Sequence, residues 1–212
     1  MMIELSKEEI QTYIAKRVSK ELTDGALVNL GIGLPTLVAN HVPEGMNITF
    51  QSENGFIGLG SSAEAEGNLI VNAGGKPVSI ISGGAFFDSA TSFGIIRGGH
   101  VDLTVLGALE VDQEGNIASY LIPGKMVPGM GGAMDLVVGA RQVVVAMQHT
   151  NKGKHKLLKK CTLPLTAKEQ VDLIITEMGV FKPVKDGFKV VELNNVFTFE
   201  EVQEATEGKL IP

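Results

Sequence analysis

Residues 51–60 read Gln-Ser-Glu-Asn-Gly-Phe-Ile-Gly-Leu-Gly, and the rest of the chain is organised around this stretch. The run Asn-Ile-Thr-Phe at residues 47–50 predicts a short buried strand, so Glu53 is expected where a strand ends. In an open α/β sheet, ligands bind outside the carboxyl ends of the strands. A carboxylate there, beside glycines that let backbone come close to a ligand, predicts nucleophilic or acid/base chemistry. The competing interpretation is that Glu53 lies in a solvated loop.

The amino-terminal segment predicts a capped helix followed by a strand. Ser6 and Glu9 fit a capping box, in which each side chain binds a backbone N–H of the other residue. Apolar residues then recur every four positions and predict a helix of about five turns that stops at Asp24 and Gly25. Residues 26–30 predict the strand that follows.

A glycine turn follows this strand. Residues 31–35 read Gly-Ile-Gly-Leu-Pro, and Pro35 suits the first turn of a helix running toward His41. The order strand, glycine turn, helix brings helix N-terminal amides to a point where an anion can bind. Simple turn chemistry is the alternative explanation for Gly31 and Gly33.

Strands and helices alternate over the rest of the chain. The further elements predicted are a polar loop at residues 61–68, a strand at 78–81 that ends before a glycine-containing segment at 82–85, strands at 101–106 and 143–147, a hairpin turn at 182–187 and a short helix after Thr198. Phe86, Phe87 and Phe93 are expected in the core. This alternation predicts an α/β fold with an open, largely parallel sheet flanked by helices, in one domain spanning residues 1–212.

The composition excludes several classes of protein. A net charge of -6 and an aromatic content of 5% argue against binding to nucleic acid. No apolar run reaches the length of a membrane span, and the amino terminus lacks the pattern of a signal peptide. A single cysteine, Cys161, excludes an internal disulfide and fits a reducing compartment. We therefore expect a cytoplasmic protein without contact to membranes.

Several polar groups outside residues 51–60 invite a functional interpretation, and each has a plainer one. His100 is a possible general base, but a histidine beside glycines is more often structural. The three acidic residues within 110–114 are expected at a solvated hairpin tip, without a histidine that would suggest a metal site. The lysines of residues 152–160 either attract phosphates or lie in a solvated loop. Cys161 lacks a local basic partner and is expected to be structural.

The pattern Ser-Glu-Asn-Gly-x-x-Gly-x-Gly at residues 52–60 resembles the signature of the family I CoA-transferases, and specifically of their β subunits. That group includes acetate (butyrate–acetoacetate) and succinyl-CoA:3-oxoacid CoA-transferases. Five further blocks match in order, at residues 29–35, 96–102, 122–126, 129–136 and 161–166. The resemblance implies the fold shared by CoA-transferase subunits and isomerases of the ribose-5-phosphate type.

The resemblance also implies a role for individual residues. Glu53 corresponds to the nucleophile, which forms an acyl anhydride and then a glutamyl-CoA thioester. Gly131 and Gly132 correspond to backbone donors for the oxyanion, with Gly132 preferred. The residues implied in binding of CoA are Asn29, Gly31, Gly33 and Lys76. An exposed turn lysine is the alternative interpretation of Lys76.

The implied activity needs no metal and no cofactor beyond the substrate coenzyme A. Fused relatives are about twice as long, so the resemblance implies a separate α subunit in a hetero-oligomer, expected as α2β2. The implied substrates are short-chain acyl-CoA and acids such as acetoacetate, acetate, butyrate or succinate. Relatives usually carry Asn-Trp where this chain has Ser119 and Tyr120, so the acid pair is left open.

Two alternatives belong to other functional classes. The first is a sugar-phosphate isomerase on the same fold, which would need a carboxylate base, a lysine and a phosphate loop. The second is a binding subunit that keeps the fold without the chemistry. Thermal-shift responses to CoA and to pentose phosphates would separate a CoA-transferase from an isomerase.

Overall fold

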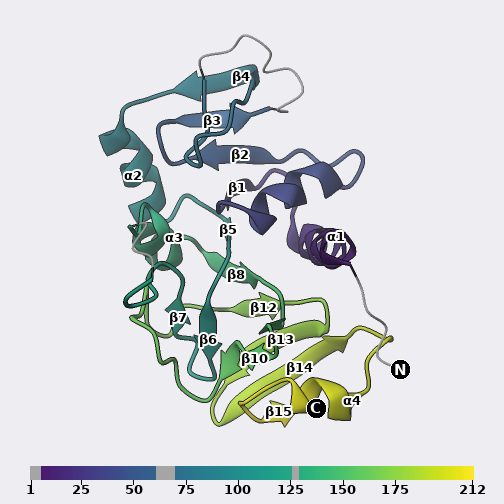
Figure 1. The fold of residues 1–212 in the computed structure, drawn as a ribbon. Helices are drawn as coiled ribbons and strands as arrows, with labels where there is room; N and C mark the ends of the chain where they lie inside the picture. The colour runs from purple at the N-terminus through teal and green to yellow at the C-terminus, as the bar shows by residue number, and fades with distance from the viewer. Residues whose placement is uncertain (1–5, 61–69, 126–128) are drawn as a thin grey trace.

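A computed structural model describes residues 6–60, 70–125 and 129–212, and their main feature is one large twisted sheet (Figure 1). Ten strands form this sheet: β1 (Leu27–Leu30), β2 (Thr49–Ser52), β3 (Phe56–Leu59), β4 (Ile80–Phe86), β5 (Leu103–Leu106), β8 (Gln142–Ala146), β12 (Leu173–Ile175), β13 (Gly179–Val184), β14 (Gly187–Leu193) and β15 (Leu210–Ile211). The loop predicted at residues 61–68 lies outside the described residues, as do Met126 and Pro128.

The strand order is β15-β14-β13-β12-β8-β5-β1-β2-β3-β4. All neighbouring pairs from β12 through β8, β5 and β1 to β2 are parallel. Antiparallel pairs flank this centre, with β2-β3-β4 on one side and β12-β13-β14 on the other. The predicted α/β fold with a largely parallel sheet is therefore confirmed, with antiparallel strands added toward both edges.

Helices cover both faces of the sheet (Figure 1). They are α1 (Lys7–Val18), the 3₁₀ helices η1 (Ser19–Glu21) and η2 (Leu34–His41), α2 (Ser89–Arg97), α3 (Ala133–Gly139) and α4 (Phe199–Glu204). One face packs against α1 and η2, and the other packs against α2 and α3. Strand residues alternate between the two cores, so that in β8 Val143 and Val145 join one cluster while Val144 joins the other.

Smaller elements project from the large sheet. They are a three-stranded sheet of β6 (Glu110–Asp112), β7 (Ile117–Ala118) and β11 (Leu157–Leu158), and a hairpin of β9 (Thr150–Asn151) and β10 (Lys154–His155). Among the described residues, no helix is both long and apolar enough to cross a membrane.

Local sequence signals decide where several helices begin. The capping box of Ser6 and Glu9 is confirmed, and a second box of Thr198 and Glu201 opens α4. Gly33 precedes η2 with a φ of 90°, a backbone conformation that side chains with a Cβ rarely adopt. The expected helix after Pro35 is therefore present, but as a 3₁₀ helix.

Three local expectations are wrong. The strand predicted at residues 78–81 begins later and continues through the glycines to Phe86, because pairing with β3 holds this segment extended. Phe86 is 60% exposed on this edge strand instead of lying in the core. Asp112 is fully buried rather than solvated, because its carboxylate accepts hydrogen bonds from the backbone of Glu114, Asn116 and Cys161.

Candidate functional site

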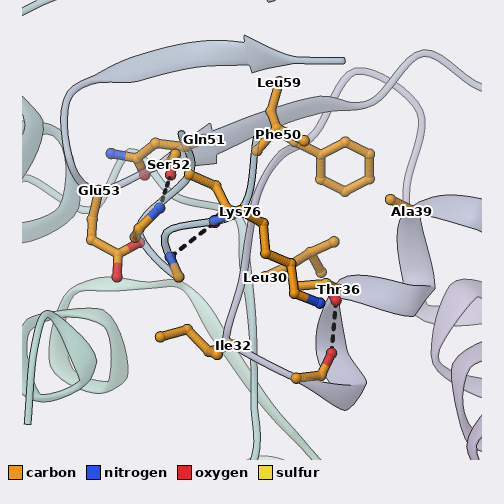
Figure 2. Close-up of a pocket in the computed structure, with 14 residues that line it drawn as sticks. Leu30, Ile32, Thr36, Ala39, Phe50, Gln51, Ser52, Glu53, Leu59 and Lys76 are labelled. Carbon is orange, nitrogen blue, oxygen red and sulfur yellow. Dashed lines mark hydrogen bonds between the residues drawn. The ribbon is translucent and has the colours of Figure 1, made fainter. Parts of the chain in front are cut away.

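A pocket opens at the carboxyl ends of β1 and β2, beside residues 51–60 (Figure 2). Its walls come from these two strands, from the start of η2 and from the turn at residues 72–76. Figure 2 shows Glu53 at one side of the pocket, and the amine of Lys76 extending toward Thr36 at the other. The pocket thus offers a carboxylate and a cation at separate points, joined by a largely apolar wall that includes Leu30 and Phe50.

Glu53 is the first residue after β2, as the sequence predicts, and hydrogen bonds hold both its side chain and its backbone. The Nδ2 of Asn29 donates to Oε2 of Glu53 across 3.2 Å. The Oγ of Ser92, on α2, donates to the backbone carbonyl of Glu53 across 2.8 Å. Because Asn29 and Ser92 are both fully buried, they fix the half-buried Glu53 from beneath.

Asn29 belongs to a polar row that crosses three neighbouring strands. It pairs in register with Thr104 on β5 and with Gln51 on β2. Gln51 donates from Nε2 to the Oγ and the carbonyl of Ser92. Parallel strands that are buried on both faces normally carry apolar side chains, so this polar row is unusual. No sequence motif marks Gln51, Ser92 or Thr104 as functional. Only the register of the strands reveals the row.

This row is incompletely satisfied. Within the described part of the chain, no hydrogen-bond partner is present for three buried atoms, Oδ1 of Asn29, Oε1 of Gln51 and Oγ1 of Thr104. Each such group costs about 1–3 kcal/mol when it is shielded from water. The fold therefore retains a costly row of polar groups across β5, β1 and β2, one of which, Asn29, contacts the Glu53 carboxylate.

Gly132 faces Glu53 from the start of α3. A Cβ atom added to Gly132 would lie 3.2 Å from Cγ and 3.5 Å from Oε1 of Glu53. Gly132 itself has a φ of -80°, which other residues also adopt, so close approach and not backbone conformation favours glycine here. The neighbouring Gly131 has a φ of 55°, and an added Cβ would meet no atom within 4 Å. Glycine is therefore favoured at position 132 by the close approach of Glu53 and at position 131 by the positive φ.

Gly31 and Gly33 take different positions around the pocket. Gly33 lines it, together with Lys76. Gly31 packs against the end of β5, where its N–H donates to the carbonyl of Val105 across 2.8 Å. The amide of Gly31 is therefore committed to the sheet, and contacts of Asn29, Gly31, Gly33 and Lys76 with CoA stay predictions.

Other candidate residues have surroundings that explain them without chemistry. His100 is exposed. Burial, reinforced by the carboxylates of Asp112 and Glu110, raises the pKa of Cys161 well above its ordinary value. A thiol that stays protonated is a poor nucleophile, which agrees with the structural role predicted for Cys161.

The lysine-rich segment at residues 152–160 is mainly exposed except around Lys156, but it contains β10 and β11 and is not only the predicted solvated loop. Burial lowers the pKa of Lys156 to about 8, and the nearby Glu177 carboxylate opposes that shift. Behind it lies the fully buried His149, which contacts the hydroxyls of Thr176 and Thr206 at 2.9 and 2.8 Å. Burial lowers the pKa of His149 to about 3, so this imidazole is neutral and structural.

A model of the Coenzyme A transferase family matches residues 11–205. The chain is 53% identical to the β subunit of the acetate CoA-transferase of Escherichia coli over 197 residues, which are 92% of this chain and 91% of that protein. It is 50% identical to the B subunit of the succinyl-CoA:3-ketoacid coenzyme A transferase of Helicobacter pylori over 200 residues, which are 92% of this chain and 96% of that protein. The mitochondrial succinyl-CoA:3-ketoacid coenzyme A transferase 2A of Rattus norvegicus is 48% identical, and the match covers 92% of this chain but 39% of that protein.

Solved structures agree on the fold. An acyl-CoA transferase of Escherichia coli superposes with a TM-score of 0.77 at 21% identity, covering 100% of this chain and 44% of that protein. The decarboxylase AibA/AibB superposes with a TM-score of 0.74 at 19% identity, covering 94% of this chain and 84% of that protein. The fold alone therefore does not identify the reaction, because a decarboxylase shares it. The family match and the close relatives indicate a CoA-transferase. The chain belongs to the coenzyme A transferase family and corresponds to its β, or B, subunits.

Proposed function

We propose that this chain is the β subunit of an enzyme that moves CoA between a short-chain acyl-CoA and a carboxylic acid, with Glu53 as the nucleophile. The observation that supports this most is the placement of Glu53 at the end of β2, where it faces both the pocket and Gly132. A carboxylate fixed by buried donors, yet open to a pocket, suits covalent catalysis. The sugar-phosphate isomerase alternative has no comparable support.

The proposed reaction begins when a carboxylate oxygen of Glu53 attacks the carbonyl carbon of the acyl-CoA. The carbon–sulfur bond breaks, CoA leaves as a thiolate, and an acyl–glutamyl anhydride remains. The thiolate then attacks the side-chain carbonyl carbon of Glu53. The bond between Cδ of Glu53 and the bridging anhydride oxygen breaks, the first acid leaves as a carboxylate that keeps this oxygen, and Glu53 carries CoA as a thioester. An incoming carboxylate reverses both steps.

Each attack builds negative charge on a carbonyl oxygen, which requires a hydrogen-bond donor at that position. We assign this role to backbone amides at Gly132 and Gly131. The absence of a side chain lets the Gly132 backbone approach Glu53, since even a methyl group would lie 3.2 Å from Cγ. Asn29, which is fully buried, holds the carboxylate through its side-chain amide.

The remainder of the CoA molecule provides binding energy away from the reacting atoms. With the thioester at Glu53, the proposed course of CoA follows the apolar wall toward Gly33 and Lys76. The Lys76 ammonium suits a phosphate group, because it is a compact charge on a flexible stem. Binding of the distant part of CoA lowers the barrier at the thioester only if the protein holds the phosphate end and the thioester end at the correct distance from each other.

An α subunit is the proposed partner, in a hetero-oligomer that we expect to be α2β2. The support lies in the names of the bacterial relatives, which are single subunits, and in the rat enzyme, of which this chain matches only 39%. For substrates we propose short-chain acyl groups with acetoacetate, acetate, butyrate or succinate, and the names of the relatives support acetate and 3-ketoacids among these. Ser119 follows β7, and its backbone N–H and its hydroxyl both form hydrogen bonds with the hydroxyl of Thr166. Ser119 does not line the pocket described above, so it gives no ground for choosing among the acids.

The decisive experiment traps the thioester on Glu53. The complex with its α subunit is incubated with acyl-CoA in the absence of an acceptor acid, and intact mass is measured. We expect one added CoA with loss of water, and peptide mapping should place it in the segment around Ser52 and Asn54. Glu53→Ala should remove both the adduct and the transfer. An acyl group on the protein in place of CoA, or full transfer by Glu53→Ala, would contradict the proposal.

A further inference from the structure

The residues on either side of Glu53 contact the turn that carries Lys76. Ser52 accepts a hydrogen bond at Oγ from the N–H of Ala73 across 2.9 Å (Figure 2). Asn54 donates from Nδ2 to the carbonyl of Val71 across 2.8 Å. The turn is thus attached to Ser52 at the end of β2 and to Asn54 in the β2–β3 connection, immediately before and immediately after the candidate nucleophile.

The turn itself is ordered by one side chain. Asn72 accepts at Oδ1 from the N–H of Gly74 and of Lys76, at 2.9 and 3.0 Å, and its own N–H donates to the carbonyl of Lys76. Val71 and Pro77 close the turn with a β-bridge. The position of Lys76 therefore follows the position of the turn as a unit, and the turn is joined to the residues that flank Glu53, Ser52 and Asn54.

We propose that Ser52 and Asn54 are positioning residues that set the span between Glu53 and Lys76 for recognition of the CoA handle. The proposal rests on the proposed function of this site, and neither residue is assigned to the chemistry. Among the described residues that line the pocket, Lys76 is the one cation, so it is the natural point for an anionic end of the ligand. When either hydrogen bond is removed, the turn shifts. The distance between the Lys76 ammonium and Glu53 then no longer matches the length of a CoA molecule whose thioester lies at Glu53.

The two contacts differ in how they can be tested. Asn54 is exposed, and Asn54→Asp keeps its shape while replacing the donor by a carboxylate that repels the Val71 carbonyl. Ser52 is buried, and Ser52→Ala removes only the accepting hydroxyl. Asn195→Asp makes the same chemical change at an exposed turn residue after β14, near the opposite edge of the sheet, and serves as the matched control.

The experiment compares acyl-CoA with the acyl thioester of pantetheine, which lacks the phosphates of CoA, using the complex with the α subunit. For acyl-CoA we expect Asn54→Asp and Ser52→Ala each to raise KM about fivefold, with kcat nearly unchanged, as for one lost hydrogen bond. For the pantetheine thioester, the variants and the wild type should have the same KM. In a Lys76→Met background, Asn54→Asp should add no further change.

Several results would overturn the inference. These are an equal rise in KM for both thioesters, a full effect of Asn54→Asp in the Lys76→Met background, or an unchanged KM for acyl-CoA. A general loss of structure would also raise KM in the pantetheine arm, so it cannot imitate the expected pattern. If the wild-type complex transferred no CoA, the proposed function would fail instead. Titration of CoA binding to the same variants would then decide on the positioning role independently.

Discussion

The side-chain amide of Asn29 lies 3.2 Å from the carboxylate of Glu53 and joins the ends of two neighbouring parallel strands. Asn29 is fully buried on β1, whereas Glu53 follows β2 and reaches the pocket. The Glu53 carboxylate, which we propose as the nucleophile, is therefore held by a residue of the packed sheet. Changes that leave the loop sequence intact can still misplace it, and misplacements of about 1 Å are costly in catalysis, on the order of 10²-fold.

Ser92 gives a first test of this dependence on the sheet. Ser92→Ala removes the donor to the Glu53 carbonyl and the partner of Gln51, without adding volume. With Glu53 as the proposed nucleophile, we expect kcat to fall by about tenfold, since one hydrogen bond that holds Glu53 is lost. Steady-state transfer assays would check this, and Ser92→Thr, which keeps the hydroxyl, should retain more activity. Equal activity of Ser92→Ala and the wild type would contradict the role.

Gly132 allows a graded test of close approach. Gly132→Ala places a methyl group 3.2 Å from Cγ of Glu53, and Gly132→Val adds further atoms in the same direction. Turnover should fall progressively, by about 10²-fold or more for valine, because the thioester and the amide donor are separated. The backbone at Gly132 tolerates side chains, so circular dichroism should remain native. A folded Gly132→Val complex with normal kcat would argue against the assignment.

Dependence on the partner is a separate expectation. The purified chain should transfer no CoA alone and should become active when the α subunit is added, since the bacterial relatives are named as single subunits and this chain matches 39% of the rat relative. A spectrophotometric transfer assay across a titration of α subunit would measure this. Robust transfer by the rigorously purified chain would show that its own residues complete the site.

Cys161 should be inert in the folded complex. Its pKa is raised by burial and by the carboxylates of Asp112 and Glu110, so little thiolate is present at pH 8. We expect iodoacetamide to label Cys161 at least about tenfold more slowly in the folded protein than after unfolding. Cys161→Ser should leave CoA transfer unchanged. Rapid labelling coupled to loss of transfer would indicate a reactive thiol and reopen the question of the nucleophile.

The buried His149 predicts how stability varies with acid. Its pKa falls from 6.5 to about 3 on folding, mainly through burial, so the unfolded chain binds a proton that the folded chain does not. The free energy of unfolding should therefore decrease as pH falls from 6.5 toward 3, by up to about 1.4 kcal/mol per pH unit from this group.

The neighbouring Glu177 changes the free energy of unfolding with pH in the opposite direction to His149. The control must therefore keep Glu177 and change only the histidine. Burial raises its pKa from 4.5, so its contribution decreases as pH rises above that value. The difference between the wild type and His149→Gln isolates the histidine term, because Glu177 and Lys156 are present in both. Denaturant unfolding at several pH values would measure it. Parallel pH profiles for the two proteins would show that His149 does not control acid stability.

Residues whose partners are close in sequence were predictable. The capping box of Ser6 and Glu9 needs only its own four residues, and Glu53 follows β2 because the apolar run before it forms a strand. The row of Thr104, Asn29 and Gln51 was not predictable, since it depends on the register of strands far apart in the sequence.

Two errors have the same origin in distant contacts. The glycines at residues 83–84 look like a strand end, but pairing with β3 keeps them in β4. Asp112 looks solvated beside Glu114, but the chain near Cys161 returns to cover it. In both cases tertiary partners override the local tendency, as is usual for strands and loops.

The unsatisfied atoms of Asn29, Gln51 and Thr104 have an evolutionary consequence. Aliphatic replacements at these three positions would remove buried polar groups, and the fold would gain stability while losing the hydrogen bond from Asn29 to Glu53, the proposed nucleophile. A descendant that had lost the reaction would be free to accumulate such replacements. The identity of these three residues in other members of the family should therefore distinguish catalytically active subunits from inactive ones, even where the residue corresponding to Glu53 is still glutamate.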